Sequence, residues 1–406
     1  MKQWIIGILL VLCSFKGFAQ SDAYEEVKSI SQEDQEMLAG LIRLVDEGKS
    51  DSAVANFDFL AKKYPKNYIV QYERLYNLYM LGKYDEVIKK KKFLLNHKYV
   101  NERAYQLIGN AYDLIGERNK AAEVYKDGIK HFPNSGSLYM ELGTINLLND
   151  EYNKALECYN RGILAQPDFV SNYYRAANLY FSSENGKVWG LIYAESAILL
   201  APSNEERHEE LAQWIIDCLK DNIKMSFEGE DTLSVRLAPS RDMKIDEKTN
   251  VVYVDFSGIY EGAIGAPLLK MLLEKEAFVG SLPQLIEIRK GLVETYFSVT
   301  DNLYGNSMYL LEFQKEVIDA GHWEAYNYFL FMHNFPEEFN AWYSADSAPL
   351  DAFIEWYNKA PYTLGDGRSV DPIQIYNNYR NIDLLQSLQI QAKLIIDKKS
   401  EDTTEE

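Results

Sequence analysis

A proline recurs at a nearly constant spacing in the first half of the chain. Pro65, Pro133, Pro167 and Pro202 are separated by 68, 34 and 35 residues, so one slot of a 34-residue period is skipped. Proline cannot continue a helix, and each one therefore marks a point where a helix has already ended. A fixed period of this length indicates an array of stacked two-helix units. Such an array presents extended surfaces, which favours binding over catalysis in a single pocket.

Other residue types keep the same period. Glycine recurs where a left-handed turn between two helices is expected, at Gly48, Gly82 and Gly116. Small residues, which let two helices approach closely, recur at Ala53, Val87, Ala121, Ala155 and Gly190, and again at Gly109, Gly143 and Ala177. Aromatic residues, expected to fill the space between neighbouring units, recur at Phe57, Tyr125 and Tyr159, and at Tyr105, Tyr139 and Tyr173.

Residues 105–112, followed by Ala121, Tyr125 and Pro133, resemble the tetratricopeptide repeat (TPR) family. The period places five units at about 34–67, 68–101, 102–135, 136–169 and 170–204. The second unit fits the pattern poorly, and the fifth carries one extra residue near 183–186. The resemblance implies a mostly α fold, in which five helix pairs form a right-handed superhelical array with a concave groove.

The register predicts which side chains of the first helices face this groove. They are Tyr72, Tyr76, Tyr79, Arg103, Gln106, Asn110, Asp113, Met140, Thr144, Tyr174, Arg175 and Asn178. Aromatic groups supply contact area and amides bind peptide backbone, so a protein or peptide partner is expected. The alternative is that some of these tyrosines only pack against a neighbouring helix. Gln106 and Glu141 depart from the pattern with which some family members clamp a C-terminal carboxylate.

The first 19 residues have the pattern of a secretory signal peptide. Lys2 supplies the positive start, an apolar run follows, and a small-x-small site ends at Ala19. We expect an exported chain, periplasmic or secreted, cleaved after about Ala19. Cys13 leaves a lipoprotein open as an alternative, although Leu12 stands where a small residue is usual. No later segment has 18 unbroken apolar residues, so no integral membrane segment is expected after cleavage.

The net charge bears on whether the chain binds nucleic acid, and the cysteines bear on whether disulfides stabilise the fold. The formal net charge of −19 predicts no nucleic-acid partner, because such a chain repels phosphates. Cys158 and Cys218, which would remain after cleavage, lie on different predicted helices, so packing rather than a disulfide framework is expected to stabilise the fold.

The rest of the chain divides into several predicted regions. Residues 20–33 are expected to be a flexible lead-in, 205–224 a capping helix, 225–396 a mainly helical domain of no recognised family, and 397–406 a disordered acidic tail. Within the domain, short strands are expected between 225 and 256. Helices are expected at 259–276, 282–301, 307–320, 323–333, 336–343, 348–359 and 382–396.

Signals for chemistry are poor. No two histidines have helical metal-ligand spacing, and Gly258, Gly262 and Gly265 after a predicted strand fit no nucleotide-binding fingerprint. No cofactor, metal or catalytic residue is therefore predicted. The aromatic-rich stretch 322–362 is expected to be mainly core, with Trp323, Trp342 and Trp356 as a possible second surface.

The leading hypothesis is an exported, non-catalytic scaffold that holds a peptide or protein in the groove. The alternative is an enzyme or carbohydrate-binding protein that acts through the C-terminal domain.

Overall fold

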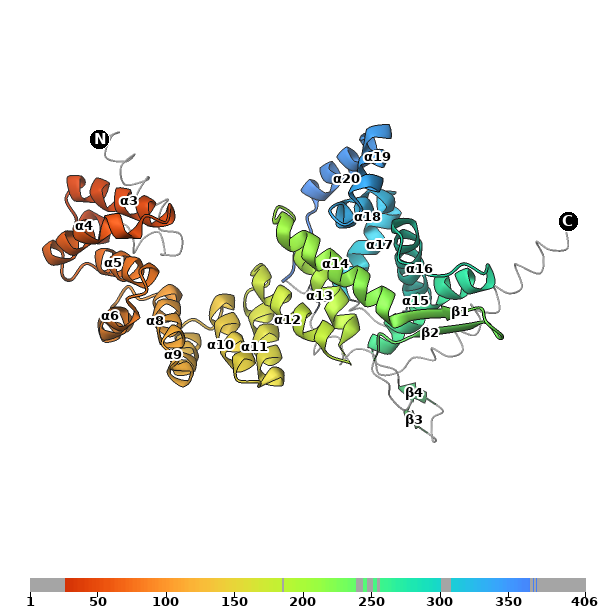
Figure 1. The fold of residues 1–406 in the computed structure, drawn as a ribbon, viewed down its shortest axis with the longest axis horizontal. Helices are drawn as coiled ribbons and strands as arrows, with labels where there is room; N and C mark the ends of the chain where they lie inside the picture. Colours follow the sequence, from red (N-terminus) through yellow and green to blue (C-terminus); the bar gives the residue numbers. More distant parts are fainter. Residues whose placement is uncertain are drawn as a thin grey trace. The chain divides into compact units, whose positions relative to one another are not determined.

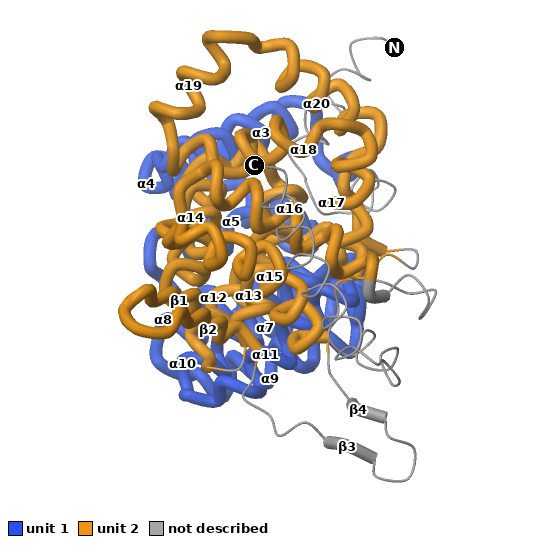
Figure 2. Tube along the Cα trace, turned by 90° about the vertical axis from the view of Figure 1, so that its right-hand side faces the viewer, with its two compact units in different colours: residues 1–165 blue, residues 166–406 orange. Residues whose placement is uncertain are grey.

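The structure is a computed structural model, and it describes residues 26–184, 186–238, 244–246, 251–253, 256–300, 308–365, 368 and 370. The predicted signal peptide, the predicted helix over 382–396 and the predicted acidic tail lie outside the described residues. The chain divides into two compact units, Met1–Ala165 (unit 1) and Gln166–Glu406 (unit 2), coloured separately in Figure 2.

Unit 1 is a series of consecutive helix pairs (Figure 1). Its helices are α3 Gln32–Asp46, α4 Ser50–Lys63, α5 Tyr68–Met80, α6 Tyr84–Lys89, α7 Lys91–Leu95, α8 Glu102–Leu114, α9 Arg118–His131, α10 Gly136–Leu148 and α11 Tyr152–Ala165. The first helices α5, α8 and α10 begin 34 residues apart, and so do the second helices α4, α6, α9 and α11. The predicted period is thus present in the helix boundaries themselves.

Local signals set these boundaries. Pro65, Pro133, Pro167 and Pro202 each lie two residues beyond the end of a helix, as predicted. At the other end, Asn67, Asn101 and Ser135 accept hydrogen bonds from backbone amides in the first turns of α5, α8 and α10. These caps also recur every 34 residues, a signal that was not used in the sequence analysis.

The turn within each pair has a left-handed residue. Gly48, Gly82 and Gly116 have φ of 75°, 73° and 83°, which confirms the predicted turn glycines. In the fourth pair the same position is Asp150, with φ 60°. An L-residue is strained in this conformation, although aspartate tolerates it better than most.

This difference predicts opposite effects of two substitutions. Gly116→Ala is expected to destabilise the chain by about 1 kcal/mol, because the added Cβ is unfavourable at positive φ. Asp150→Gly is expected to stabilise it by up to about 1 kcal/mol, since it relieves that strain. Denaturant unfolding followed by far-UV circular dichroism measures both. Equal effects of the same sign would show that the turn angle does not limit stability.

Recurring glycines and tyrosines pack against each other inside the helix pairs, Gly109 against Tyr125 and Gly143 against Tyr159. A Cβ added at Gly109 would lie 2.2 Å from Cε1 of Tyr125, and one at Gly143 would lie 2.4 Å from Cε1 of Tyr159. Both rings are fully buried. Each of these two rings thus fills space inside its own pair, and Tyr125 is also close enough to Tyr79 and Glu141 of the neighbouring units to interact with them electrostatically.

The predicted lead-in is packed where the structure describes it. Val27 and Ile30 are buried in the core of the first helix pair. The side-chain amide of Gln35 donates to both of their carbonyl oxygens, at 3.0 and 2.8 Å. Flexibility was therefore the wrong expectation for residues 26–33, because two apolar side chains close the open end of the array.

Unit 2 contains the fifth helix pair, the predicted capping helix and the C-terminal helices. Its helices are α12 Val170–Ser182, α13 Lys187–Leu200, α14 Glu205–Asn222, α15 Phe256–Leu273, α16 Leu282–Thr300, α17 Tyr309–Asp319, α18 Trp323–Phe331, α19 Pro336–Ala345 and α20 Ala348–Lys359. Strands β1 Ile223–Ser226 and β2 Thr232–Val235 form one antiparallel pair, and β3 Lys244–Asp246 and β4 Val251–Tyr253 form another. The mostly helical prediction, with a few short strands, is confirmed.

Helix α15 corrects one detail of the sequence analysis. It begins at Phe256, so Gly258, Gly262 and Gly265 lie inside a helix rather than in a loop after a strand. Their apparent resemblance to a phosphate-binding loop has no structural basis.

Helix α13 lies at the centre of unit 2. Every residue from Val188 to Leu199 is buried. A helix that is apolar on all sides must be surrounded by other elements, and α13 contacts α12, α14 and α15. The fifth repeat therefore belongs to the same compact unit as the C-terminal helices, rather than ending the array beside them.

Candidate functional site

Side chains from three first helices of unit 1 form the candidate site, which we call the inner face. Its members are Tyr76 and Tyr79 on α5, Arg103, Gln106 and Asn110 on α8, and Met140 on α10. All six are half-buried. Positions 103, 106 and 110 are three and four residues apart, which places them on one side of α8.

Aromatic rings make up one end of the inner face. Tyr76 and Tyr79 stack with ring centroids 6.4 Å apart, and the edge of Tyr84 meets Tyr79 at 5.4 Å. The Tyr125 hydroxyl donates to Oδ1 of Asn110, which fixes the amide. Tyr72 does not join them, because only 6% of its surface is exposed. Its prediction as a groove residue was wrong, since it packs in the core near Tyr68.

Arg103 carries the positive charge of the inner face. It makes no hydrogen bond or ion pair with the described part of the chain, whereas nearby Arg74 pairs with Asp58 at 2.6 Å. Arg103 also acts electrostatically on Glu73, whose pKa is raised to about 8 by burial, with Arg103 opposing the shift and Asp46 adding to it. Burial thus disfavours the charged form of the Glu73 carboxyl, and the charge of Arg103 opposes this effect.

Two other predicted residues of unit 1 are engaged within the chain. The carboxylate of Asp113 lies 3.7 Å from Arg118 Nε. The hydroxyl of Thr144 donates to the Met140 carbonyl oxygen at 3.0 Å, one turn back along α10. Neither side chain therefore offers its full hydrogen-bonding capacity to a partner.

The predicted groove residues of unit 2 lie on α12 and differ in accessibility. The Tyr174 hydroxyl donates to Glu210 at 2.8 Å, and its ring meets Trp214 at 5.2 Å. The Tyr174 side chain is therefore engaged by helix α14. Arg175 and Asn178 remain exposed on the same helix.

The three tryptophans of the predicted second surface do not converge. Trp323 is 6% exposed, and its indole N–H donates to the Ile286 carbonyl oxygen at 3.0 Å. It belongs to the core, so its prediction as a surface residue was wrong. Trp356 is half-buried beside Phe313, at 5.9 Å between ring centroids. Trp342 lies on α19 and stacks on Tyr328.

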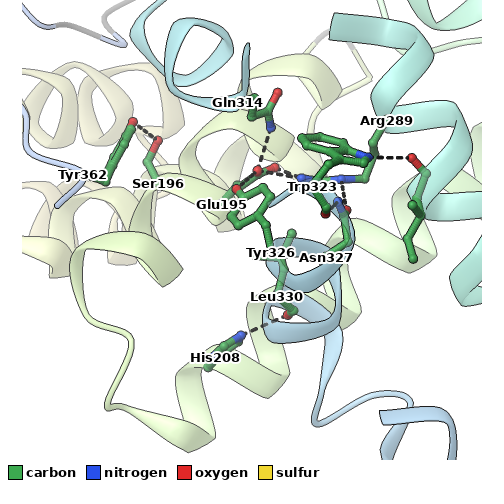
Figure 3. A network of polar contacts seen from close by, with 11 residues as sticks. Glu195, Ser196, His208, Arg289, Gln314, Trp323, Tyr326, Asn327, Leu330 and Tyr362 are labelled. Carbon is green, nitrogen blue, oxygen red and sulfur yellow. Dashed lines mark hydrogen bonds and ion pairs between the residues drawn. The ribbon is translucent and has the colours of Figure 1, made fainter. Parts of the chain in front are cut away.

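A buried ion pair in unit 2 was missed by the sequence analysis (Figure 3). Glu195 on α13 and Arg289 on α16 are each about 5% exposed. The guanidinium binds both carboxylate oxygens, at 2.7 and 2.9 Å. Gln314 donates to Glu195 at 2.6 Å and Tyr326 donates to the same oxygen. This carboxylate thus has four donors from three helices.

The remaining donors of the network are also satisfied. Arg289 Nε donates to Asn327 Oδ1 at 2.9 Å, and the amide of Asn327 donates to the Trp323 carbonyl oxygen at 2.8 Å. Burial alone would lower the pKa of Arg289, but the Glu195 carboxylate outweighs it and raises that pKa. A charge pair with hydrogen bonds to several helices joins those helices, and we regard it as structural.

His208 on α14 makes a second buried contact in Figure 3. Its Nε2 lies 2.9 Å from the Leu330 carbonyl oxygen, and its ring lies against Phe329 and His333. Burial lowers the pKa of His208 to about 4, because the charged imidazole is poorly solvated there.

Unit 2 is therefore expected to lose stability on acidification. Below pH 6.5 the unfolded chain binds a proton at His208, whereas the folded chain does so only near pH 4. The expected loss between these values is about 2–3 kcal/mol. His208→Gln should flatten this part of the stability profile, and His131→Gln, at an exposed histidine, is the control. Unfolding titrations across pH 4–7 that show parallel profiles for wild type and His208→Gln would contradict the assignment.

The described residues contain no group of three or more His, Cys, Asp or Glu side chains placed to hold a metal ion. Burial raises the pKa of Cys158 to about 11 and of Cys218 to about 12, so both stay as thiols near neutral pH. None of the helices in the described ranges is long and apolar enough to cross a membrane.

Comparison with known proteins identifies the repeat. Residues 102–134 match the tetratricopeptide repeat family model. Comparison with curated proteins finds no match to the sequence. Solved structures that are similar include a thermophilic TPR protein, TTC0263 of Thermus thermophilus, with 20% identity, 45% of this chain and 99% of that chain covered, and a TM-score of 0.39.

Two further solved structures illustrate the range of likeness. YrrB, described as a TPR protein with an unusual peptide-binding site, has 14% identity, covers 41% of this chain and 86% of its own, and has a TM-score of 0.31. The human IFIT1 dimer with PPP-AAAA has 10% identity, covers 79% of this chain and 73% of its own, and has a TM-score of 0.34.

The family match falls on α8 and α9. The glycine, tyrosine and proline residues that recur every 34 residues are all present there. Helix pairs before and after it repeat the same 34-residue boundaries. Residues 102–134 of this chain therefore form a tetratricopeptide repeat, and the neighbouring helix pairs keep its 34-residue period.

Proposed function

We propose that this chain is an exported, non-catalytic scaffold whose inner face holds an extended peptide segment of a partner protein. The observation that carries the proposal is Arg103, a half-buried guanidinium without an ion pair in the described structure, set among stacked tyrosines and amides. Tyrosine and arginine are the side chains that most often dominate the binding energy of protein interfaces.

The chemistry of the inner face indicates what part of a peptide it fits. The stacked rings of Tyr76 and Tyr79 offer apolar area, and Gln106 offers an amide to peptide backbone. Arg103 would pair with an acidic group of the peptide, because its guanidinium has no ion pair within the described residues. Export is supported by the sequence pattern of residues 1–19.

Capture from a periplasmic extract on the immobilised chain tests this function. Arg103→Glu is expected to reduce capture of the specific partner about ten-fold, because it replaces an attraction with a repulsion. Arg161→Glu is the matched control, since Arg161 is exposed on α11 and, among the residues that the structure describes, pairs with Glu157 of its own helix. Arg175→Glu reports whether exposed residues of α12 take part. Equal capture by wild type and Arg103→Glu would refute binding at the inner face.

A further inference from the structure

Helix α19 is an aromatic helix without a buried residue. None of the ten residues of Pro336–Ala345 is buried. Its apolar side chains Phe339, Trp342 and Tyr343 are only partly covered, and Tyr343 is 41% exposed. Helix α19 lies at the margin of unit 2 in both views (Figures 1 and 2). A helix of this length is marginal in water unless one face is packed, so this face gains from a partner.

Four aromatic rings on α18 and α19 lie next to one another and form one continuous surface. Trp342 stacks on Tyr328 of α18 with ring centroids 4.2 Å apart and planes at 6°. Phe339 stacks on Tyr343 at 5.8 Å and 10°. Phe339 also lies 6.4 Å from Trp342, so the four rings are continuous. We call Tyr328, Phe339, Trp342 and Tyr343 the aromatic patch.

The surroundings of the aromatic patch carry charge of one sign. Residues 323–358 include six acidic residues and no lysine or arginine. Glu337 and Glu338 are exposed in the first turn of α19. Glu324 precedes Tyr328 by four residues on α18 and Glu338 precedes Trp342 by four residues on α19, so each acid lies on the same side of its helix as a ring of the patch. Burial raises the pKa of the Tyr328 hydroxyl, and both carboxylates add to the shift.

We propose that the aromatic patch and the carboxylates beside it dock a basic, apolar segment of a partner protein. Indole and phenol rings attract lysine and arginine through their faces. Carboxylates at the rim pair with the same cations, and the ring surface buries aliphatic side chains next to them. An acidic or purely polar partner would gain neither interaction.

The test uses the full chain and a synthetic amphipathic peptide of leucine and lysine, with a leucine–glutamate peptide of the same pattern as the reversed-charge probe. Calorimetric titration is expected to show that the lysine peptide binds at the aromatic patch, whereas substitutions in the patch leave any binding of the glutamate peptide unchanged. Trp342→Ala with Tyr343→Ala should weaken it about ten-fold, and Glu337→Gln with Glu338→Gln about five-fold with a smaller salt dependence. Neither change removes a buried side chain, so unit 2 should stay folded by circular dichroism.

Controls separate this surface from the charge of the whole chain and from the inner face. Glu205→Gln with Glu206→Gln removes two exposed carboxylates at the start of α14 and should change affinity less than about two-fold. Arg103→Glu should likewise leave peptide binding unchanged. A loss with Glu205→Gln and Glu206→Gln as large as that with Glu337→Gln and Glu338→Gln would overturn the proposal in favour of bulk attraction.

Three other occupants would also overturn it, and each gives a distinct result. Tighter peptide binding by a chain ending at Val370 would indicate that residues 371–406 cover the patch. Dimers that dissociate in the Trp342→Ala, Tyr343→Ala variant would indicate a second copy. Binding of soluble oligosaccharides that is lost in the same variant but kept after Glu337→Gln and Glu338→Gln would indicate a carbohydrate.

Discussion

Replacing Glu195 by alanine is expected to destabilise unit 2 by about 3–5 kcal/mol. The substitution leaves Arg289 charged and about 95% shielded from solvent, with its two strongest hydrogen-bond acceptors removed. Gln314 and Tyr326 would each lose an acceptor as well. The cost comes mainly from the uncompensated charge rather than from the lost attraction.

The double variant Glu195→Met, Arg289→Met is the informative companion. Removing both charges and filling the space with apolar side chains should recover most of the stability lost in the single variant. Glu355→Ala is the control, because the Glu355–Lys359 pair has a similar distance of 2.7 Å but both side chains are 72% exposed. Its expected cost is much smaller, because solvent screens an exposed pair.

Tryptophan fluorescence during denaturant unfolding measures these effects in the intact chain. The five tryptophans that follow residue 19, namely Trp189, Trp214, Trp323, Trp342 and Trp356, all lie in unit 2. Their signal therefore reports that unit. If Glu195→Ala and Glu355→Ala shift the midpoint equally, the buried pair does not hold unit 2 together.

Gly109→Ala is expected to destabilise unit 1 by about 2–3 kcal/mol. The new methyl group would lie 2.2, 2.5 and 2.9 Å from three ring atoms of Tyr125. That ring is 1% exposed and its hydroxyl is held by Asn110, so it has little room to move. Helices α8 and α9 must therefore separate, and the misfit spreads to the pair on either side.

Gly40→Ala provides a control of the same chemical change. Gly40 lies inside α3, and an added Cβ there meets nothing within 4 Å. It should stabilise the helix by about 0.5–1 kcal/mol, since alanine favours the helical backbone. Hydrogen exchange of α8 and α9 amides measures the effect on their own pair. Slower or unchanged exchange in Gly109→Ala would show that the close approach of the two helices is not needed.

The fold of unit 1 could be predicted closely because its signals are local. The prolines that follow helices, the turn glycines and the contacts between small residues and aromatic rings all act within one helix pair. Because the pair is repeated, each of these signals appears several times in the sequence. The site could be predicted less well. The repeat register predicted that Tyr72 faces the groove together with Tyr76 and Tyr79. In the structure Tyr72 is buried in the core and does not reach that surface. Likewise Tyr174 was expected to be open, and α14 occupies it.

The lead-in and the tryptophans were misjudged for a related reason. Val27 and Ile30 stand in a polar stretch, yet the open end of the first pair offers them a core. Trp323 and Trp342 are both in an aromatic-rich stretch, and only the packing of α18 against α16 buries the first and leaves the second at the surface. Composition does not distinguish the two environments.

The sequence by itself determined the repeat period, the helix boundaries of the array and the conformation of its turns, because these depend on contacts within about 34 residues. Only the tertiary structure decided that α13, while it pairs with α12, becomes the centre of unit 2. One signal was present in the sequence: Glu195 is the one acidic residue in the mainly apolar helix Lys187–Leu200. Its partner Arg289 lies 94 residues away, and a pair so distant forms only when packing brings α13 and α16 together and removes water from both charges.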